Sequence, residues 1–189
     1  MQTKTGATFI AETLKGHDIT HVFFMEATMR KSLIEMEAQG IKRILAHSEK
    51  AAAYMADGYA RMSRKMGVCL SQSVGAANLA AGLQDAYLGG SPVIAITGRR
   101  PPLEAYRNGY QEVAHEPLFE AVTKFQANIV DVEQMPLVFR QAIRQAKSGQ
   151  PGPVHIDMAG IEGKIESDEG NLQVVIDDAY RQFPSNRVA

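Results

Sequence analysis

The residue of this sequence that is best placed to take part in chemistry is Glu49, which follows an apolar run and begins an alanine-rich segment. Ala52, Ala56 and Ala60 recur at i, i+4 and i+8, a stripe of small side chains that permits close approach by another backbone or by a flat ligand. Two interpretations of Glu49 are open at this point. An acid in the first turn of a helix stabilises the helix dipole by about 0.3–1 kcal/mol. The alternative is that the stripe of small side chains beside Glu49 lies against a flat ligand.

Several other catalytic and binding motifs are absent. A dinucleotide site requires Gly-x-Gly-x-x-Gly after the first apolar run, a P-loop requires Gly-Lys-Ser/Thr and a hydrolase elbow requires Gly-x-Ser-x-Gly; the sequence has none of them there. The five histidines are scattered without metal-ligand spacing, so we expect no metal site in this chain. We predict that His155, inside an apolar run, is a hydrogen-bonded core residue.

Composition narrows the class of protein further. The 189 residues include 20 basic and 21 acidic side chains, which gives a net charge of −1 with no block of like charge. This balance argues against nucleic-acid and membrane-surface partners. No apolar run approaches the roughly 20 residues that span a bilayer, and the first 15 residues do not resemble a signal peptide. With Cys69 as the single cysteine, we expect a cytoplasmic protein.

The elements that position Glu49 follow from the alternation of apolar runs and helical patterns. Because most of the runs are continuous rather than alternating, they predict strands covered on both faces. The predicted fold is therefore α/β, an open, mostly parallel six-stranded sheet with helices on both faces. The six runs are Val22–Met25, Ile44–Ala46, Val68–Leu70, Val93–Ile96, Phe125–Val130 and Val154–Ile156.

Helices are predicted between these runs from apolar residues at i, i+4 and i+7, and from capping residues. Ser48 is a candidate N-cap, and Gly16, Gly40 and Gly67 are candidate C-terminal caps. The helical sets are Ala7, Ile10, Ala11 and Leu14; Met29, Leu33 and Met36; Met55, Tyr59 and Met62; Leu79, Leu83 and Ala86; and Val138, Ala142 and Ala146.

The composition changes after Asp157. Residues 162–171 hold four acidic residues and two glycines. We therefore expect one domain over residues 1–160 and a partly ordered tail or interdomain linker over 161–189.

The order of several motifs resembles the N-terminal pyrimidine-binding domain of thiamine diphosphate-dependent enzymes, especially their acetolactate synthase-like branch. The resemblance covers about residues 5–157. Its motifs are Glu49 with Ala-Ala-x-x-Ala-Asp-Gly-Tyr-Ala-Arg at 52–61, Gly67–Leu70, Ala77-Asn78-Leu79, Pro92–Gly98, Tyr110-Gln111-Glu112-Val113, Thr123-Lys124 and Gly149–Asp157.

The resemblance implies roles for individual residues. Glu49 matches the glutamate that hydrogen-bonds N1′ of the cofactor aminopyrimidine and so activates thiamine diphosphate to attack a 2-keto acid. The turn with Ser73, Val74, Gly75 and Asn78 matches a cofactor-binding segment. On the substrate side, Met25 and Gln111 match positions near the reacting centre, and Lys124 matches a basic residue that we expect at the same strand end, with a surface lysine as the alternative.

The sequence departs from the family pattern at two turns. The turn after the first strand reads Met25-Glu26-Ala27-Thr28-Met29 without Gly or Pro, which predicts a backbone that does not easily take positive φ. The turn at 73–78 is one residue shorter than the family's and lacks proline. These changes leave open a catalytically degenerate assembly or regulatory domain, and a flavodoxin-like nucleotide-binding domain is a third hypothesis.

The Gly-Asp-Gly motif, which in this family holds the cofactor diphosphate through Mg²⁺, does not occur in the sequence. The resemblance therefore implies a diphosphate-binding domain on the same or another chain, and self-association. We expect the chain to be the N-terminal piece of a longer 2-keto acid decarboxylase or carboligase, inactive alone, with the small subunit of a split enzyme as the alternative.

Overall fold

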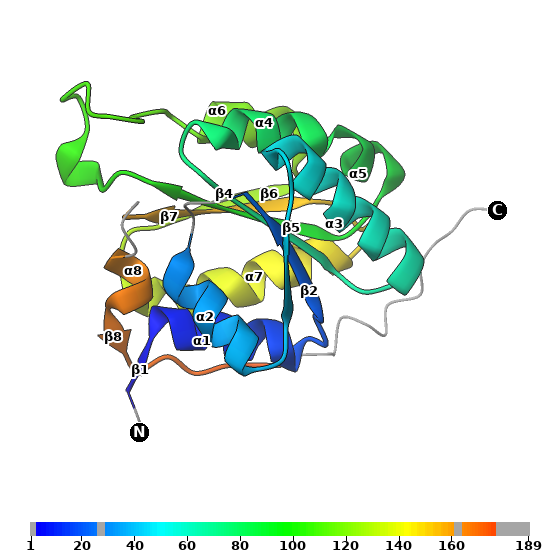
Figure 1. Cartoon of the computed structure of the whole chain (residues 1–189), viewed down its shortest axis with the longest axis horizontal. Helices are drawn as coiled ribbons and strands as arrows, with labels where there is room; N and C mark the ends of the chain where they lie inside the picture. Colours follow the sequence, from blue (N-terminus) through cyan, green and yellow to red (C-terminus); the bar gives the residue numbers. More distant parts are fainter. Residues whose placement is uncertain (1–2, 26–28, 161–163, 177–189) are drawn as a thin grey trace.

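A computed structural model describes residues 3–25, 29–160 and 164–176 of the chain (Figure 1). Its centre is a six-stranded sheet in the order β3-β2-β4-β5-β7-β6, in which every neighbouring pair is parallel. The predicted fold class is confirmed, and each predicted apolar run coincides with one strand, although Met25, Ala46 and Val130 lie one residue beyond the strand ends. The strands are β2 (His21–Phe24), β3 (Lys42–Leu45), β4 (Gly67–Gln72), β5 (Val93–Arg99), β6 (Phe125–Ile129) and β7 (Val154–Ala159).

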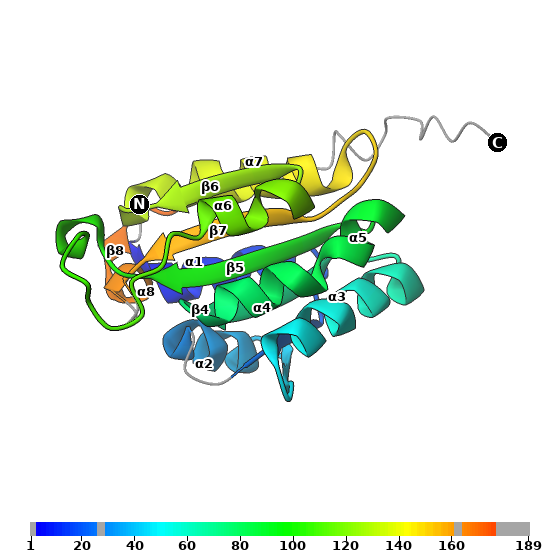
Figure 2. The same cartoon turned by 90° about the horizontal axis from the view of Figure 1, so that it is seen from above.

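Helices cover both faces of this sheet, as Figures 1 and 2 show. One face carries α1 (Gly6–Gly16), α2 (Arg30–Ala38) and α7 (Met135–Lys147). The other carries α3 (Glu49–Ser63), α4 (Gly75–Gly82), α5 (Gln84–Gly89) and the short α6 (Glu116–Phe119). Among the described residues, none of the helices is both long and apolar enough to cross a lipid bilayer.

The two faces are packed with side chains of different size. The core under α1, α2 and α7 is built from large residues, with Phe9 and Phe139 in an edge-to-face contact at 5.6 Å between ring centroids. The core under α3 and α4 is rich in alanine. On this side a Cβ on Gly82 would lie 2.7 Å from Ala53 Cβ, and one on Gly67 would lie 2.2 Å from the Ala56 carbonyl oxygen. The alanine stripe therefore serves close packing of α3 on α4 and β4.

The buried face of α3 is formed by its alanines. The helix is confirmed, but the residues whose spacing predicts it do not form its buried face: Met55 is 40% and Met62 87% exposed, and the alanines are buried instead. Small side chains are buried here because the neighbouring backbones approach too closely for larger ones. The predicted helix through Leu79 and Ala86 also differs, since it is divided into α4 and α5 at Leu83.

The predicted caps are confirmed in part. Gly40 follows α2 with φ +76°, as a C-terminal cap requires. Gly16 is instead the last residue of α1, and Gly67 begins β4; after α3 the left-handed conformation belongs to Arg64, with φ +58°. Gly67 is needed for its close contact with Ala56, not for a turn.

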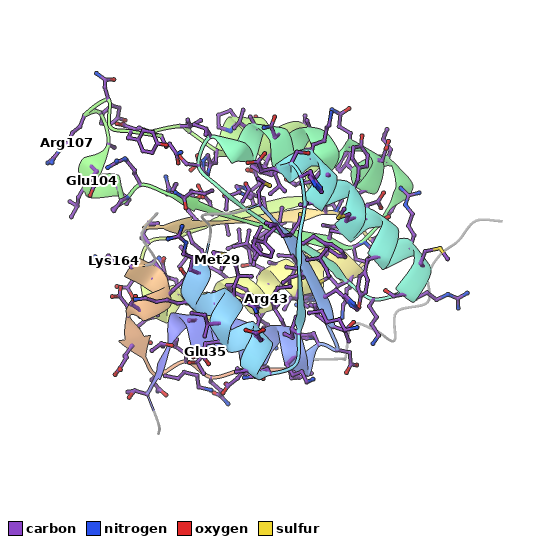
Figure 3. All side chains as sticks on the ribbon, in the orientation of Figure 1. Met29, Glu35, Arg43, Glu104, Arg107 and Lys164 are labelled. Atoms are coloured by element: carbon purple, nitrogen blue, oxygen red, sulfur yellow. The ribbon has the colours of Figure 1, made fainter. Side chains whose placement is uncertain are left out.

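Beyond residue 160, the described part of the chain packs on α1 and α2. The short helix α8 (Lys164–Ser167) and strand β8 (Glu169–Gly170) follow, and β8 pairs antiparallel with β1 (Lys4–Thr5). Glu166 is buried and its Oε1 accepts a hydrogen bond from the Ser32 amide at 2.7 Å. Because no side chain caps α2 at Met29, Glu166 supplies the missing acceptor at the start of that helix. Figure 3 labels Lys164 and Met29 at the beginnings of the two helices.

The strand order reverses between β2 and β4: from β2 the chain continues to β3 on one side of β2, and then crosses to β4 on the other side. In open parallel sheets, ligands bind at the carboxyl ends of the strands beside such a point. The residues that follow β2, β3 and β4 therefore meet at one edge of the sheet.

Candidate functional site

Glu49 lies at this edge because Ser48 starts α3 directly after β3. Ser48 has an extended backbone and its Oγ accepts a hydrogen bond from the Ala51 amide at 3.1 Å, as predicted for an N-cap. Glu49 is then the first residue of the helix and is only partly exposed. The position of its carboxyl group is therefore set by the start of a helix rather than by a loop.

The Glu49 carboxyl group contacts the start of α4. Asn78 Nδ2 donates a hydrogen bond to Glu49 Oε2 at 3.2 Å. A Cβ on Gly75 would lie 2.4 Å from Glu49 Oε1, far inside van der Waals contact, so only glycine leaves the carboxylate in place. The structure thus brings together Glu49, Gly75 and Asn78, while Val74 lies at the rim with 53% of its surface exposed.

Ser73 joins this group to Gln111. The buried Ser73 hydroxyl donates a hydrogen bond to the Gln111 carbonyl oxygen, and the Ser73 amide donates to Gly98 O at 2.9 Å. Gln111 Nε2 donates to the Tyr110 hydroxyl at 2.9 Å. Its Oε1 is buried and has no hydrogen-bond partner among the described residues. An amide oxygen in this position is available to accept a hydrogen bond from a ligand.

The backbone at this edge is strained in three places. Met29, Ser73 and Gln111 have φ values of +41°, +32° and +61°, although none of them is glycine. Such conformations cost of order 1 kcal/mol or more each and are found preferentially at functional sites. The expectation that the turn after β2 does not take positive φ is wrong at its last residue, Met29. Met25 follows β2 at the same edge, and Glu26 is outside the described residues.

Lys124 is not part of this group. It precedes β6 and therefore lies at the amino edge of the sheet, opposite Glu49. Its ammonium group donates hydrogen bonds to the carbonyl oxygens of Gln145 and Ser148, each at 2.9 Å, and of Gln150. These carbonyls belong to the end of α7 and the turn after it, where a cation is favourable. Partial burial lowers the pKa of Lys124. The structure gives this lysine a structural role.

A buried polar cluster that was not predicted from the sequence lies next to the site. Thr97, His115, His155 and Asp157 are all buried and share hydrogen bonds below the carboxyl end of β5. His155 is a hydrogen-bonded core residue, as predicted, and its ring stacks on Phe119 at 3.6 Å. Burial, with the nearby His115 and Arg99, lowers the pKa of His155 well below its ordinary value. Thr97 and Asp157 each directly follow a predicted apolar run, and the pairing of β5 with β7 brings them together; nothing in the sequence placed His115 beside them.

Comparison with known proteins gives consistent results. Residues 4–118 match the family model of the thiamine pyrophosphate enzyme N-terminal TPP binding domain. A probable acetolactate synthase large subunit of Methanocaldococcus jannaschii is 38% identical over 155 residues, 81% of this chain and 26% of that protein. The chloroplastic acetolactate synthase of Arabidopsis thaliana is 34% identical over 160 residues, 83% of this chain and 24% of that protein.

A solved structure shares the fold. The thiamine diphosphate-dependent 4-hydroxybenzoylformate decarboxylase of Rhodococcus jostii RHA1 superposes with a TM-score of 0.76 at 21% identity, over 82% of this chain and 30% of that one. The chain thus matches between about a quarter and a third of the length of these proteins.

Proposed function

We propose a function from one premise: the chain belongs to the thiamine pyrophosphate enzymes, as their N-terminal TPP binding domain. The site at the carboxyl edge binds the aminopyrimidine half of thiamine diphosphate, and Glu49 is the residue that hydrogen-bonds its ring nitrogen N1′. The observation that carries this proposal is the contact between Glu49 and Gly75. Because a Cβ at position 75 would displace the Glu49 carboxyl group, glycine is needed to keep that group where it is. When bound, the cofactor supplies a carbon nucleophile and an electron sink for chemistry at 2-keto acids.

The residues present fit the cofactor half that they would hold. Asn78 fixes one oxygen of Glu49, which leaves the other directed along Gly75 for a ligand. The unpartnered Gln111 Oε1 provides an acceptor on the substrate side, and Ser73 fixes the Gln111 main chain. Val74 and Met25 would border the same ligand. These residues orient the cofactor and hold a proton between Glu49 and the bound ring.

The diphosphate and Mg²⁺ would be held elsewhere. Because the sequence has no Gly-Asp-Gly, we propose that a diphosphate-binding domain of the same or another chain completes the site. Exposed apolar side chains on α3 and α5, together with Val74 directly before α4, support association with a second copy. They are Tyr54, Met55, Met62, Val74, Tyr87 and Leu88. The buried, unpaired Cys69 is compatible with the cytoplasmic location that we propose.

The proposed activity is that of a 2-keto acid decarboxylase or carboligase of the acetolactate synthase type. Its test is Glu49→Gln in the complete enzyme, with Glu35→Gln on α2, across the sheet from α3 (Figure 3), as the matched control. We expect Glu49→Gln to lower keto-acid turnover by about 10²–10⁴-fold, the usual contribution of a proton-transferring side chain, and the control to leave turnover unchanged. Equal turnover of the two variants would contradict the assignment and favour an assembly or regulatory domain.

A further inference from the structure

The segment between β5 and α6 is held at both of its ends by one side chain. This segment, residues 100–114, carries Gln111, and we call it the Gln111 loop. Figure 2 shows it leaving the carboxyl end of β5, and Figure 3 labels Glu104 and Arg107 on its outer part, beyond the sheet. Arg99, directly before the loop, has Nε 3.1 Å from Asp157 Oδ2. His115, directly after it, has Nδ1 2.9 Å from Asp157 Oδ1.

Asp157 can hold both ends because its position in the sheet is fixed. It pairs with Thr97 across β5 and β7, and Thr97 Oγ1 donates a hydrogen bond to Asp157 Oδ1 at 2.8 Å. Thr97 Oγ1 lies 2.7 Å from His155 Nε2. Since the threonine proton is committed to Asp157, the hydroxyl accepts from His155. The carboxylate is fully buried, and its charge is compensated by these donors and by Arg99.

The Gln111 loop has internal hydrogen bonds, so that a displacement of its ends would also displace Gln111. Arg100 Nε donates to the Tyr110 carbonyl oxygen at 2.6 Å. The Glu112 carboxylate accepts from the amides of Tyr106 and Gly109, and these bonds lower the pKa of Glu112. The loop is therefore a folded unit, and its ends determine where Gln111 lies relative to Ser73.

The geometry favours a hydrogen-bonded network over a metal centre. His115, His155 and Asp157 offer three ligand atoms within 4.8 Å of one another. However, the Thr97 hydroxyl lies 2.7–3.2 Å from an atom of each of them. The space between the three atoms is thus taken by a hydroxyl group. The guanidinium of Arg99 beside Asp157 also opposes a cation.

We propose that Asp157 is a positioning residue, whose carboxylate fastens both ends of the Gln111 loop and so holds Gln111 at the cofactor edge of the sheet. This inference rests on the proposed function, in which Gln111 borders the cofactor. His115 and Arg99 are the partners through which Asp157 acts.

The test compares Asp157→Asn with Asp57→Asn in the intact protein. Asp57 is a suitable control because it is also buried and ion-paired, with Arg61 at 2.9 Å, but lies on α3 away from the loop. Hydrogen exchange of the amides of residues 104–114 should become about tenfold faster or more in Asp157→Asn and stay unchanged in Asp57→Asn. If Asp157→Asn does not fold, His115→Gln releases one end of the loop and should give the same local increase.

A double-mutant cycle connects the loop to the site. In the complete enzyme, Asp157→Asn should lower keto-acid turnover, and this effect should vanish when Gln111 is already alanine. Unchanged exchange of the loop overturns the proposal. Additive effects of the two substitutions overturn it as well, because Asp157 would then not act through Gln111. If the purified protein contained stoichiometric zinc, and His155→Gln lost it, the cluster would be a metal site rather than a hydrogen-bonded network, and the proposal would be overturned.

The outcomes also separate this inference from the proposed function. A wild-type enzyme that does not bind thiamine diphosphate refutes the proposed function and, with it, the role of Gln111. The exchange comparison does not require cofactor, so it decides by itself whether Asp157 fastens the loop.

Discussion

Replacing Gly75 by alanine should reduce catalysis without reducing stability. The new Cβ would lie 2.4 Å from Glu49 Oε1 and 2.8 Å from its Cδ, whereas ordinary contacts begin near 3.4 Å. The carboxyl group must therefore move by about 1 Å, and it can do so because it is the end of a flexible side chain. Alanine is also the better helix former, by up to about 1 kcal/mol, and Gly75 is in α4.

The expected magnitude follows from that displacement. A misplacement of about 1 Å in a reacting group costs on the order of 10²-fold in rate, or about 2.7 kcal/mol of transition-state stabilisation. Gly75→Ala should thus lower turnover of the complete enzyme about 10²-fold, while the free energy of unfolding in urea stays unchanged or rises by up to about 1 kcal/mol.

Gly58→Ala is the matched control. Gly58 is also a helical glycine, exposed on α3, but a Cβ there meets nothing within 4 Å. It should show the stabilisation and keep wild-type turnover. Wild-type turnover in Gly75→Ala would refute the reasoning, because the place of the Glu49 carboxyl group would not matter. A large loss of stability in Gly75→Ala would refute it too, because it would mean that the backbone, and not the Glu49 side chain, moves to accommodate the new Cβ.

Three further predictions concern the structure around the site. Lys124→Met removes the donor to three carbonyl oxygens. It should lower the free energy of unfolding, measured in urea, by about 1–3 kcal/mol and leave turnover unchanged. Reduced turnover at wild-type stability would instead favour a substrate-side lysine. Because the pKa of His155 is lowered in the folded state, the unfolded state binds the extra proton below pH 6.5, so stability should decrease as pH falls from 7 to 5, by up to about 1.4 kcal/mol per unit, and His155→Gln should flatten this slope. Ala53→Leu would overpack the contact with Gly82 and should destabilise the fold by at least about 1–3 kcal/mol in thermal unfolding; a neutral result would mean that α3 and α4 separate easily.

The sequence predicts most of the fold because its central strands, β4, β5 and β7, are buried on both faces. Continuous apolar runs such as Val93–Ile96 and Val154–Ile156 have few alternatives to a central parallel strand, and the helical patterns between them require crossover connections. The face that a helix buries was harder to predict. In α3, large apolar residues and alanines occupy different faces, and only the distance to Gly67 and Gly82 decides which face packs.

The candidate site was predictable where it depends on local order along the chain. Ser48 and Glu49 form a capped helix start, which sequence alone indicates, and the turn at 73–78 follows a predicted strand. Lys124 was misplaced although the sequence indicates its edge, because it directly precedes the predicted run Phe125–Val130 and therefore lies at the amino end of a parallel strand. His115 was missed because its bond to Asp157 joins positions 42 residues apart, through a loop without regular periodicity.

The pairing of β1 with β8 has a consequence for how this fold can be used in protein engineering. Thr5 lies opposite Glu169, and the Gly6 amide donates to the Asp168 carbonyl oxygen at 3.0 Å, so the first and last described elements meet at one place. The described chain does not end there, because residues 171–176 run on to the far end of α1, where a Cβ on Gly16 would lie 2.4 Å from Ile176 Cδ1. A circular permutant opened at the exposed turn around Gly149 would therefore need a link that runs the length of α1, from Ile176 back to Lys4.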